Sequence, residues 1–514
     1  MGVKLGNGKW AIKEDKLLAY NDNSGRFFNK EFDFSRGSSA TYVAKDGLIK
    51  TAGLQETNLV NNGDFSELGS ELITNGNFNT DSDWDKGTGW SISGGKANCD
   101  GTQTGNTNLN NSSNNGIVNN KFYKIVYTIS NYVSGSIRIK AGNTGFGIYH
   151  SSNGTYTQYI KAQVTTFPYA QFNADADFIG SIDNVSVKQV DPNEYWTLGT
   201  GWSFGDNKAI FNGGTDANLS SSVNVVNGKS YKYNFTIADM NTGSLSFRLG
   251  SSSTNDLRVT SNGYYSGQAI SDGTSILFRA ESGFNGSITN ISVQEIQTDT
   301  PRIDFSDTVK GALLLEPSST QLLQYSEDFS QWSGINSSRA SILKNQVISP
   351  DGSITADRLS DADNSSNYHN LFQYLTFTSG NPYVFSFFAK AGTSDYVNFY
   401  LDNGHCAFQF STKTLSGANS SNCTYTEFEN GWYLLTFYKS SLSSTSRPIS
   451  IYTGGGTSDS DGSYIGNPSK NVFIWGAQVE AGNYRTSYIP NHGVSGGVTR
   501  LADVCNNSGS AQDF

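Results

Sequence analysis

Carboxylates and histidines are the side chains of this sequence that could carry acid–base chemistry. Asp81, Asp83 and Asp85 alternate along one segment and Asp175 and Asp177 along another, so each set would share one face of a strand. A glycoside hydrolase instead needs two carboxyl groups that face each other across a cleft, with one of them kept protonated. Neighbouring carboxylates on one face more often cap loops or bind calcium.

Other catalytic signatures are also missing from the sequence. No Gly-x-Ser-x-Gly segment is followed by a matching Asp and His, and no glycine-rich loop carries the lysine of a phosphate site. The histidines (His150, His369, His405 and His492) are dispersed, and no cysteine pair has the ligand spacing of a zinc site. The sequence therefore predicts that the chain is not an enzyme.

The composition is typical of strands joined by many turns. The 514 residues include 27 Tyr, 31 Phe, 8 Trp and 55 Gly but only 2 Met, and charged residues make up 16%. Helical proteins rely on Ala, Leu, Glu, Lys and Met, whereas aromatic residues favour strands. At about 150 residues per domain, the chain has room for three to four domains. We therefore predict an all-β protein with several cores.

The charge balance argues against two classes of partner. The 35 Lys and Arg residues against 45 Asp and Glu residues give a net charge of −10, and no long basic run interrupts this balance. Binding to nucleic acid or to an anionic membrane needs concentrated positive charge. The N-terminal segment lacks the apolar core of a signal peptide, and no stretch approaches 18 uninterrupted apolar residues. We expect no nucleic acid, no membrane insertion and synthesis in the cytoplasm.

The cysteines are too few and too scattered for a disulfide framework. Cys99, Cys406, Cys423 and Cys505 are the only four in the chain. Cys406 and Cys423 could face each other across a hairpin, and whether they are bridged stays open. A reducing compartment is the simpler expectation.

An internal repeat lies in the first half of the chain. Residues 121–129 (KFYKIVYTI) match residues 229–237 (KSYKYNFTI), and Gly-Thr-Gly-Trp-Ser occurs at both 87–91 and 199–203. Apolar and polar residues alternate within these segments, as they do in a half-buried strand. Short strands separated by Gly, Asn and Ser turns over about 110 residues indicate an antiparallel β-sandwich. We therefore predict two copies of one sandwich module.

A third, longer unit follows the repeats and shows strand-like segments in the same order. It begins at 325–332 (YSEDFSQW) and closes with 472–480 (VFIWGAQVE). The predicted fold is therefore a tandem array of antiparallel β-sandwiches with a small N-terminal base region. The predicted units are a base at 1–55 continued by 298–320, module 1 at 56–190, module 2 at 191–297, module 3 at 321–490 and a C-terminal tail at 491–514.

Four spaced pieces of the sequence resemble a signature of structural proteins of tailed bacteriophages. They are 34–43 (FSRGSSATYV), 301–305 (PRIDF), 311–317 (GALLLEP) and 498–503 (VTRLAD). The segment 318–490 is similar to the lectin-like sandwich that follows this signature in phage fibre and spike proteins, although Gln321 stands where Asn is more usual. The resemblance implies a virion protein. It also implies that the two repeats were inserted into a single base region.

The two repeats resemble jelly-roll carbohydrate-binding modules. Such modules begin with an Asn-Gly-Asp/Asn-Phe turn and end in a strand like 182–187 (IDNVSV). Two such turns occur in this chain, at 62–65 (NGDF) and 75–78 (NGNF), and which of them opens module 1 stays open.

The same resemblance implies a structural Ca²⁺ in module 1, between the opening turn and the closing strand. Its ligands would be Asp183, Asn75 and Asn77, because Ca²⁺ prefers several oxygen donors. Module 2 has Thr289 in place of Asp183, which argues against a second site there. The run 458–462 (SDSDG) also resembles a calcium loop, with an ordinary solvated turn as the alternative.

Lectin sites stack an exposed aromatic ring on a sugar and surround it with Asn, Asp and Gln. Trp90 and Trp202 are predicted to be core residues, because both repeats keep them in the same context. Aromatic residues in polar, loop-like segments are better platforms, and a half-buried surface position is the alternative for each. The predicted glycan-binding residues are Trp84, Tyr149, Tyr156, Trp332, Tyr368 and His369.

These observations together lead to one expected function and two alternatives. We expect a non-enzymatic fibre, spike or capsid-decorating protein on the virion surface, attaching to host surface glycans through weak sites strengthened by repetition. Its partners would be capsid or tail proteins and further copies of the chain. A trimer is the common oligomeric state of such phage proteins, although the sequence has no heptad segment that would form a trimeric coiled coil. The alternatives are a structural decoration without sugar affinity and, third, a polysaccharide depolymerase.

Overall fold

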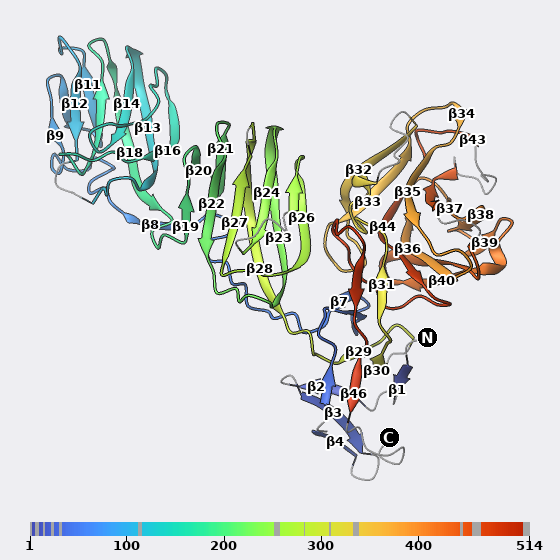
Figure 1. Cartoon of the computed structure of the whole chain (residues 1–514). Helices are drawn as coiled ribbons and strands as arrows, with labels where there is room; N and C mark the ends of the chain where they lie inside the picture. Colours follow the sequence, from blue (N-terminus) through green and yellow to red (C-terminus); the bar gives the residue numbers. More distant parts are fainter. Residues whose placement is uncertain are drawn as a thin grey trace.

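The computed structural model describes residues 3–5, 10–13, 16–21, 25–29, 33–111, 116–250, 257–281, 283–307, 310–332, 339–442, 446–454 and 464–506. In these residues the chain consists of antiparallel sheets with a few short 3-10 turns, which confirms the predicted all-β class. The described part contains no helix of the length and apolar character that a membrane span requires. Figure 1 shows three sandwiches and a small base, with modules 1 and 2 in one arm and module 3 in the other.

Module 1 packs two sheets face to face. One has the order β10-β11-β18-β13-β16 with β8 added to β18, and the other is five-stranded with the order β15-β14-β17-β12-β9. The strands are β8 (Leu68–Glu71), β9 (Asp85–Lys86), β10 (Trp90–Ser93), β11 (Lys96–Asp100), β12 (Thr107–Asn110), β13 (Phe122–Ser134), β14 (Ile137–Ala141), β15 (Gly145–Phe146), β16 (Gly154–Lys161), β17 (Ala170–Ala174) and β18 (Ile179–Val190).

Module 2 repeats this arrangement. Its sheets have the orders β20-β21-β28-β23-β26 and β19-β22-β27-β24-β25. The strands are β19 (Trp196–Leu198), β20 (Trp202–Gly205), β21 (Lys208–Asn212), β22 (Ala217–Ser222), β23 (Ser230–Thr242), β24 (Leu245–Leu249), β25 (Leu257–Val259), β26 (Gly263–Ile270), β27 (Ser275–Ala280) and β28 (Asn285–Ile296).

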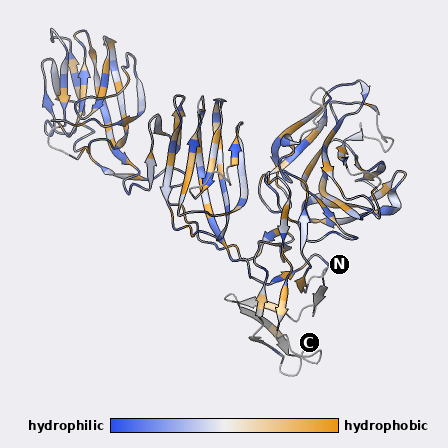
Figure 2. Cartoon of the chain, viewed as in Figure 1, coloured by the Kyte–Doolittle hydropathy of each residue, from blue (hydrophilic) through white to orange (hydrophobic). Residues whose placement is uncertain are grey.

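Side chains of alternating polarity form these strands and their cores. In β13 every second residue from Tyr123 to Ile129 is buried, and β23 follows the same rule from Tyr231 to Ile237. Figure 2 shows apolar and polar positions alternating along the strands. Trp90 and Trp202 are also buried, which confirms their predicted core positions.

The two Asn-Gly turns belong to different modules. The turn at 75–78 places Phe78 against Trp84 in the core of module 1, with ring centroids 5.1 Å apart. The turn at 62–65 places Phe65 against Trp196 in the core of module 2, with ring centroids 5.0 Å apart. The earlier turn therefore opens module 2, and the later turn opens module 1.

Module 1 is consequently inserted into a loop of module 2. Residues 56–67 and 191–296 build module 2, while residues 68–190 build module 1, so the predicted start of module 1 at residue 56 is wrong. The two ends of module 1 lie side by side, because β8 pairs with β18 and Leu68 lies opposite Val190. At the contact between the modules, Phe122 meets Phe204 edge to face and Lys124 pairs with Asp206 at 3.3 Å.

Module 3 is a larger sandwich with sheets ordered β32-β33-β44-β36-β41-β40 and β35-β42-β37-β38-β39. Cys406 and Cys423 are free thiols on β38 and β40, which belong to opposite sheets, so they do not form the pair across a hairpin that we considered. The strands are β32 (Ala340–Val347), β33 (Ala356–Asp361), β34 (Ser366–Asn367), β35 (Asn370–Thr376), β36 (Tyr383–Ala391), β37 (Tyr396–Leu401), β38 (Gly404–Gln409), β39 (Thr414–Ser416), β40 (Cys423–Phe428), β41 (Trp432–Lys439), β42 (Ser446–Tyr452), β43 (Tyr464–Ile465) and β44 (Asn471–Ala481).

The base is assembled from short strands of three distant chain segments. Among its pairs, β1 joins β30, β5 joins β46, and β31 joins β45. The strands are β1 (Val3–Leu5), β2 (Trp10–Lys13), β3 (Lys16–Asn21), β4 (Arg26–Asn29), β5 (Asp33–Ser35), β6 (Thr41–Val43), β7 (Ile49–Thr51), β29 (Arg302–Asp304), β30 (Ala312–Leu315), β31 (Ser319–Gln321), β45 (Val498–Arg500) and β46 (Val504–Asn506).

A buried network of charges, the base ion network, holds these segments together. Arg302 pairs with Glu316 at 2.8 Å and with Asp503, Arg36 pairs with Asp503 at 3.1 Å, and Arg500 lies 3.5 Å from Glu316. The five side chains are at most 5% exposed. All five come from the four sequence pieces that carry the phage resemblance. The structure therefore brings those pieces together at one place.

Candidate functional site

The five-stranded sheet of module 1 turns one polar face away from the core. We call this surface the module 1 face. The strand register aligns its outward side chains into two rows across β14, β17 and β12, extended at the edges by β15 and β9. The rows are Arg138, Asn173 and Asn108, and Phe146, Lys140, Gln171, Asn110 and Asp85.

Two exposed aromatic rings flank Arg138 on this face. Its guanidinium carbon lies 4.0 Å from the ring centroid of Phe146 and 4.5 Å from that of Tyr149. The register of β14 with β15 places Phe146 opposite Lys140, and the bridge from Ile137 to His150 brings Tyr149 alongside. Phe146 is 49% and Tyr149 43% exposed. Cation–π attraction therefore holds the Arg138 side chain in place while both rings stay accessible.

The polar groups of the face are only partly satisfied. Asn173 donates to Asn108 at 2.9 Å, and the Lys140 ammonium donates to Gln171 at 3.3 Å. Arg138 Nε and Asn110 Oδ1 are shielded from solvent but have no hydrogen-bond partner within the described residues. Such atoms cost free energy until a ligand or an ordered water supplies the missing partner.

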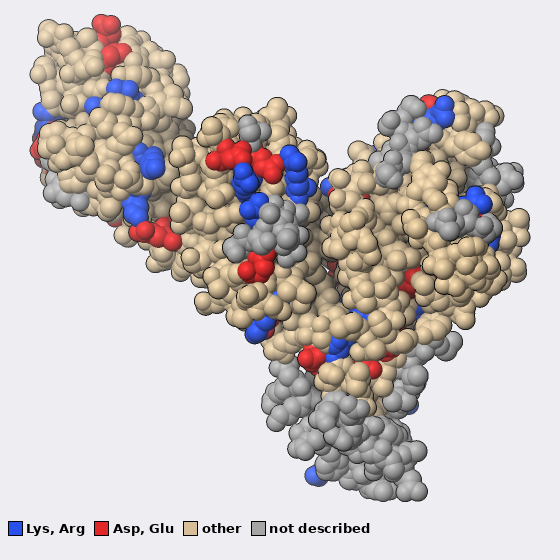
Figure 3. Space-filling model, in the orientation of Figure 1, with Lys and Arg blue, Asp and Glu red and all other residues tan. Residues whose placement is uncertain are grey.

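The corresponding face of module 2 has a different character. Ser246, Arg279 and Asn218 stand where module 1 has Arg138, Asn173 and Asn108. Arg279 pairs with Asp216 at 2.6 Å, and Arg258 of the edge strand pairs with Glu281 at 2.8 Å. Figure 3 shows acidic and basic side chains gathered together on this module. Module 2 therefore neutralises the charges of its own sheet face.

Three of the predicted glycan-binding residues lie in cores instead. Trp84 is 5% exposed and its indole N–H donates to the carbonyl of Asn75 at 3.1 Å. Trp332 is buried in module 3, and its indole N–H donates to the carbonyl of Tyr325. His369 is fully buried among backbone carbonyls. A ring platform must be exposed, so these three predictions are wrong.

The other three candidates are separated in the structure. Tyr149 is part of the module 1 face. Tyr156 stacks on His150 at the margin of the same module's core, with ring centroids 3.7 Å apart. Tyr368 is half exposed on module 3. Arg138 and Phe146 were not identified as site residues from the sequence. The alternation of apolar and polar residues from Ile137 to Ala141 could have shown that Arg138 points outward.

The predicted calcium ligands are partly engaged inside the protein. The Asn75 amide donates to the carbonyls of Thr80 and Ser82, at 2.6 and 2.9 Å, and so closes its own turn. Asp183 accepts the backbone N–H of Asn184 at 2.6 Å, and Asn77 is exposed. The described residues include no group of three or more His, Cys, Asp or Glu that could hold a metal. The Asp183 site stays a prediction, and the run 458–462 lies outside the described residues.

The paired carboxylates cap loops. The Asp175 carboxylate accepts the backbone N–H of Ser136 at 2.8 Å, the Ser136 hydroxyl at 2.6 Å and the N–H of Asp177 at 3.1 Å. Asp81 pairs with Lys86, and Asp83 accepts the hydroxyl of Ser82.

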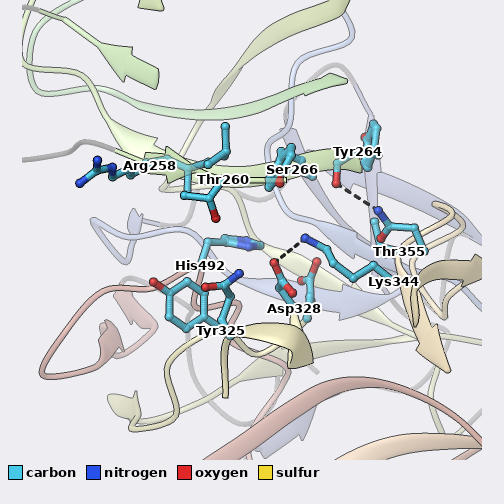
Figure 4. A pocket seen from close by; sticks show the side chains of 15 residues that line it. Arg258, Thr260, Tyr264, Ser266, Tyr325, Asp328, Lys344, Thr355 and His492 are labelled. Carbon is cyan, nitrogen blue, oxygen red and sulfur yellow. Dashed lines mark hydrogen bonds and ion pairs between the residues drawn. The ribbon is translucent and has the colours of Figure 1, made fainter. Parts of the chain in front are cut away.

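A hollow lies at the junction of modules 2 and 3 (Figure 4). Lys344 pairs there with Asp328 at 2.8 Å and lies over the Tyr265 ring, while the Asn345 amide donates to the carbonyl of Tyr264 at 3.3 Å. Burial, and next the charge of Asp351, raise the pKa of the half-buried Glu327 to about 8. The hollow measures about 60 Å³, room for a few water molecules but not a sugar ring. It is therefore a module junction and not a glycan site.

Two solved structures are similar to this chain at low identity. The tandem CBM22 domains at the N-terminus of Xyn10C from Paenibacillus barcinonensis are 12% identical, over 56% of this chain and 94% of that one, with a TM-score of 0.21. A triple jelly-roll protein from the turret of an archaeal virus is 12% identical, over 81% of this chain and 91% of that one, with a TM-score of 0.16. No family model and no curated protein matches the sequence. At these scores neither likeness bears on function.

Proposed function

We propose that this chain is a non-enzymatic structural protein on the surface of a tailed-phage virion, a fibre, spike or capsid decoration. Its module 1 face attaches to a host surface polysaccharide. The observation that carries the proposal is the arrangement of Arg138 between the exposed rings of Phe146 and Tyr149, beside two rows of amide side chains.

The chemistry of this face matches that of a sugar. A pyranose ring has apolar C–H faces and outward hydroxyl groups. Phe146 and Tyr149 offer apolar surface, and the amides of the partly exposed Asn108 and Asn110 can both donate and accept hydrogen bonds. Gln171 and Asn173 are largely buried, at 6% and 5% exposure. Asn110 Oδ1 and Arg138 Nε have no hydrogen-bond partner within the described residues and lie just beneath this surface, shielded from solvent.

The base supports the virion part of the proposal. The four pieces that resemble the phage signature meet in the base ion network, at the opposite end of the arm from module 1 (Figure 1). Such a base would contact capsid or tail proteins, while the modules extend toward the host. Further copies of the chain would raise the avidity of weak sugar sites through effective concentration.

The test is binding of the full-length protein to a panel of host-envelope polysaccharides, with chain length monitored by size-exclusion chromatography. Phe146→Ala and Tyr149→Ala together should lower affinity about tenfold or more, or ~1.4 kcal/mol. Asn108→Ala should also weaken binding, whereas the matched change Asn218→Ala on module 2 should not. Shortened chains would overturn the non-enzymatic assignment and favour a depolymerase.

A second candidate is a rigid structural spacer without sugar affinity. The ion pair and ring contacts between modules 1 and 2 favour it, because they fix the arm as one unit. A well-folded protein that binds no polysaccharide of the panel would support this candidate over the first.

A further inference from the structure

We infer that the ligand of the module 1 face is an acidic glycan, whose anionic substituent binds between Arg138 and Lys140. This inference rests on the proposed function and specifies its ligand. It starts from charges that the protein leaves unmatched.

Arg138 and Lys140 are two neighbouring cations without a counter-ion. They stand two positions apart on β14 and so share one face. Within the described residues, neither has a carboxylate at ion-pair distance, and the Arg138 guanidinium donates no hydrogen bond. Burial, and next the charge of Arg138, lower the pKa of Lys140, as expected for two adjacent cations.

The acidic residues of the same face do not fill this role. Asp175 directs its carboxylate to the backbone and hydroxyl of Ser136. Asp85 lies on β9, three strands from Lys140 on β14, a distance of roughly 14 Å at the usual strand spacing.

Several other exposed cations of this acidic chain have a carboxylate partner. Lys208 pairs with Asp239 at 2.7 Å, and Lys413 pairs with Glu427 at 2.7 Å. On the equivalent face of module 2, Arg279 has its own carboxylate partner. Arg138 and Lys140 differ from such pairs because they stand next to each other on one face with no carboxylate of the described residues at ion-pair distance, in a protein of net charge −10, and an anionic ligand would supply the missing charge.

The geometry also suits an anion. The rings of Phe146 and Tyr149 hold the Arg138 guanidinium through π contacts, which use none of its N–H donors. These donors form a fork that matches a carboxylate or a sulfate in two parallel hydrogen bonds. The Lys140 ammonium adds a second charge, and the partly exposed Asn108, which accepts a hydrogen bond from the buried Asn173, continues the row where the sugar hydroxyls would lie.

The experiment compares three polymers on the full-length protein: a polyuronate, dextran sulfate and neutral dextran. We expect at least one acidic polymer to bind more tightly than dextran, and its binding to weaken between about 50 and 300 mM NaCl as charges are screened. Arg138→Gln and Lys140→Gln should each reduce that affinity about tenfold. The charge-matched control Arg279→Gln on module 2 should leave it unchanged. The stronger acidic polymer identifies the substituent as carboxylate or sulfate.

The outcomes separate this inference from the proposed function. Equal binding of dextran and both acidic polymers, unaffected by Arg138→Gln, would overturn the inference and leave a neutral-glycan site. An equal loss in the Arg279→Gln control would overturn it too, because attraction would then be non-specific. Absence of binding to these polymers and to the whole polysaccharide panel would overturn both. Near-UV circular dichroism of each variant verifies that its fold is retained.

Discussion

Arg36 and Asp503 lie 467 positions apart in the sequence and form a 3.1 Å ion pair in which neither side chain is exposed. Asp503 also accepts the backbone N–H of Glu316 at 2.8 Å and pairs with Arg302. The Asp503 carboxylate thus joins three distant segments of the base: its own, the segment of Arg36 and the segment of Arg302 and Glu316.

Asp503→Asn should destabilise the base strongly. The substitution leaves the buried charges of Arg36 and Arg302 without their shared counter-ion, which typically costs about 3–5 kcal/mol. Urea unfolding, followed by hydrogen exchange in β5 and β29, measures the loss. The control is Glu427→Gln, which breaks the exposed pair with Lys413. Equal stability of the two variants would contradict the role assigned to the base ion network.

Acid should open the base through Glu316. Burial alone would raise the pKa of Glu316, but the charges of Arg302 and Arg500, with hydrogen bonds from Ser487, outweigh burial and hold it below its ordinary value of 4.5. The ionised form therefore stabilises the fold above pH 4.5, and this contribution is lost as the pH falls through the lower folded pKa. Glu316→Gln should lower stability at neutral pH and flatten its dependence between pH 5 and 3. The measurement is the free energy of unfolding as a function of pH for the parent and for Glu316→Gln. The same pH dependence in both proteins would refute this assignment.

Alkaline pH should loosen the junction between modules 2 and 3. The pKa of Glu327 is raised to about 8 by burial and by Asp351, partly offset by the Tyr488 hydrogen bond and the charge of Lys232. Its neutral form therefore favours the closed junction, and this contribution is lost as the pH rises through about 8. Small-angle X-ray scattering should show a larger radius of gyration at about pH 9.5 than at pH 7.

Glu327→Gln is the control for this expansion. The variant stays neutral at every pH and should keep its compact radius of gyration at alkaline pH. Asp357, whose pKa is also raised to about 8 by burial and by Asp328, is present in both proteins and cancels in the comparison. If the radius of gyration of the parent and of Glu327→Gln increased equally at alkaline pH, the expansion would be due to another titrating group.

Module 1 should be removable without unfolding module 2. Replacing residues 66–195 with the segment 79–83, which joins Phe78 to Trp84 in module 1, would join Phe65 to Trp196 in the same way. We expect the shortened protein to unfold within about 5 °C of the parent by calorimetry. Loss of the module 2 transition would show that module 2 depends on its insert.

The strands and their cores were predictable because alternation reports directly on burial. Tyr123 to Ile129 and both repeated tryptophans follow that rule. The nesting of module 1 was not predictable, because the turns at 62–65 and 75–78 are nearly identical in sequence. Their tertiary contacts distinguish them: Phe65 packs on Trp196, and the carbonyl of Gly63 accepts the N–H of Ile291 of module 2.

The candidate site was predictable only in part. Tyr149 was identified from its polar neighbours, but the same criterion failed for Trp84, because the Asn75 carbonyl binds its indole N–H inside the core. Arg138 and Phe146 meet Tyr149 through the register of β14, β15 and the bridge at Ile137. Sequence spacing does not report such cross-strand contacts.

The pairing of Arg36 with Asp503 also imposes an order on synthesis. At about 5–20 residues per second, the ribosome needs roughly 20–90 s to produce the 467 positions between them. Modules 1 and 2 complete their strands long before Asp503 emerges. A chain that stops short of this residue therefore carries folded modules on a base whose Arg36 and Arg302 lack their shared counter-ion.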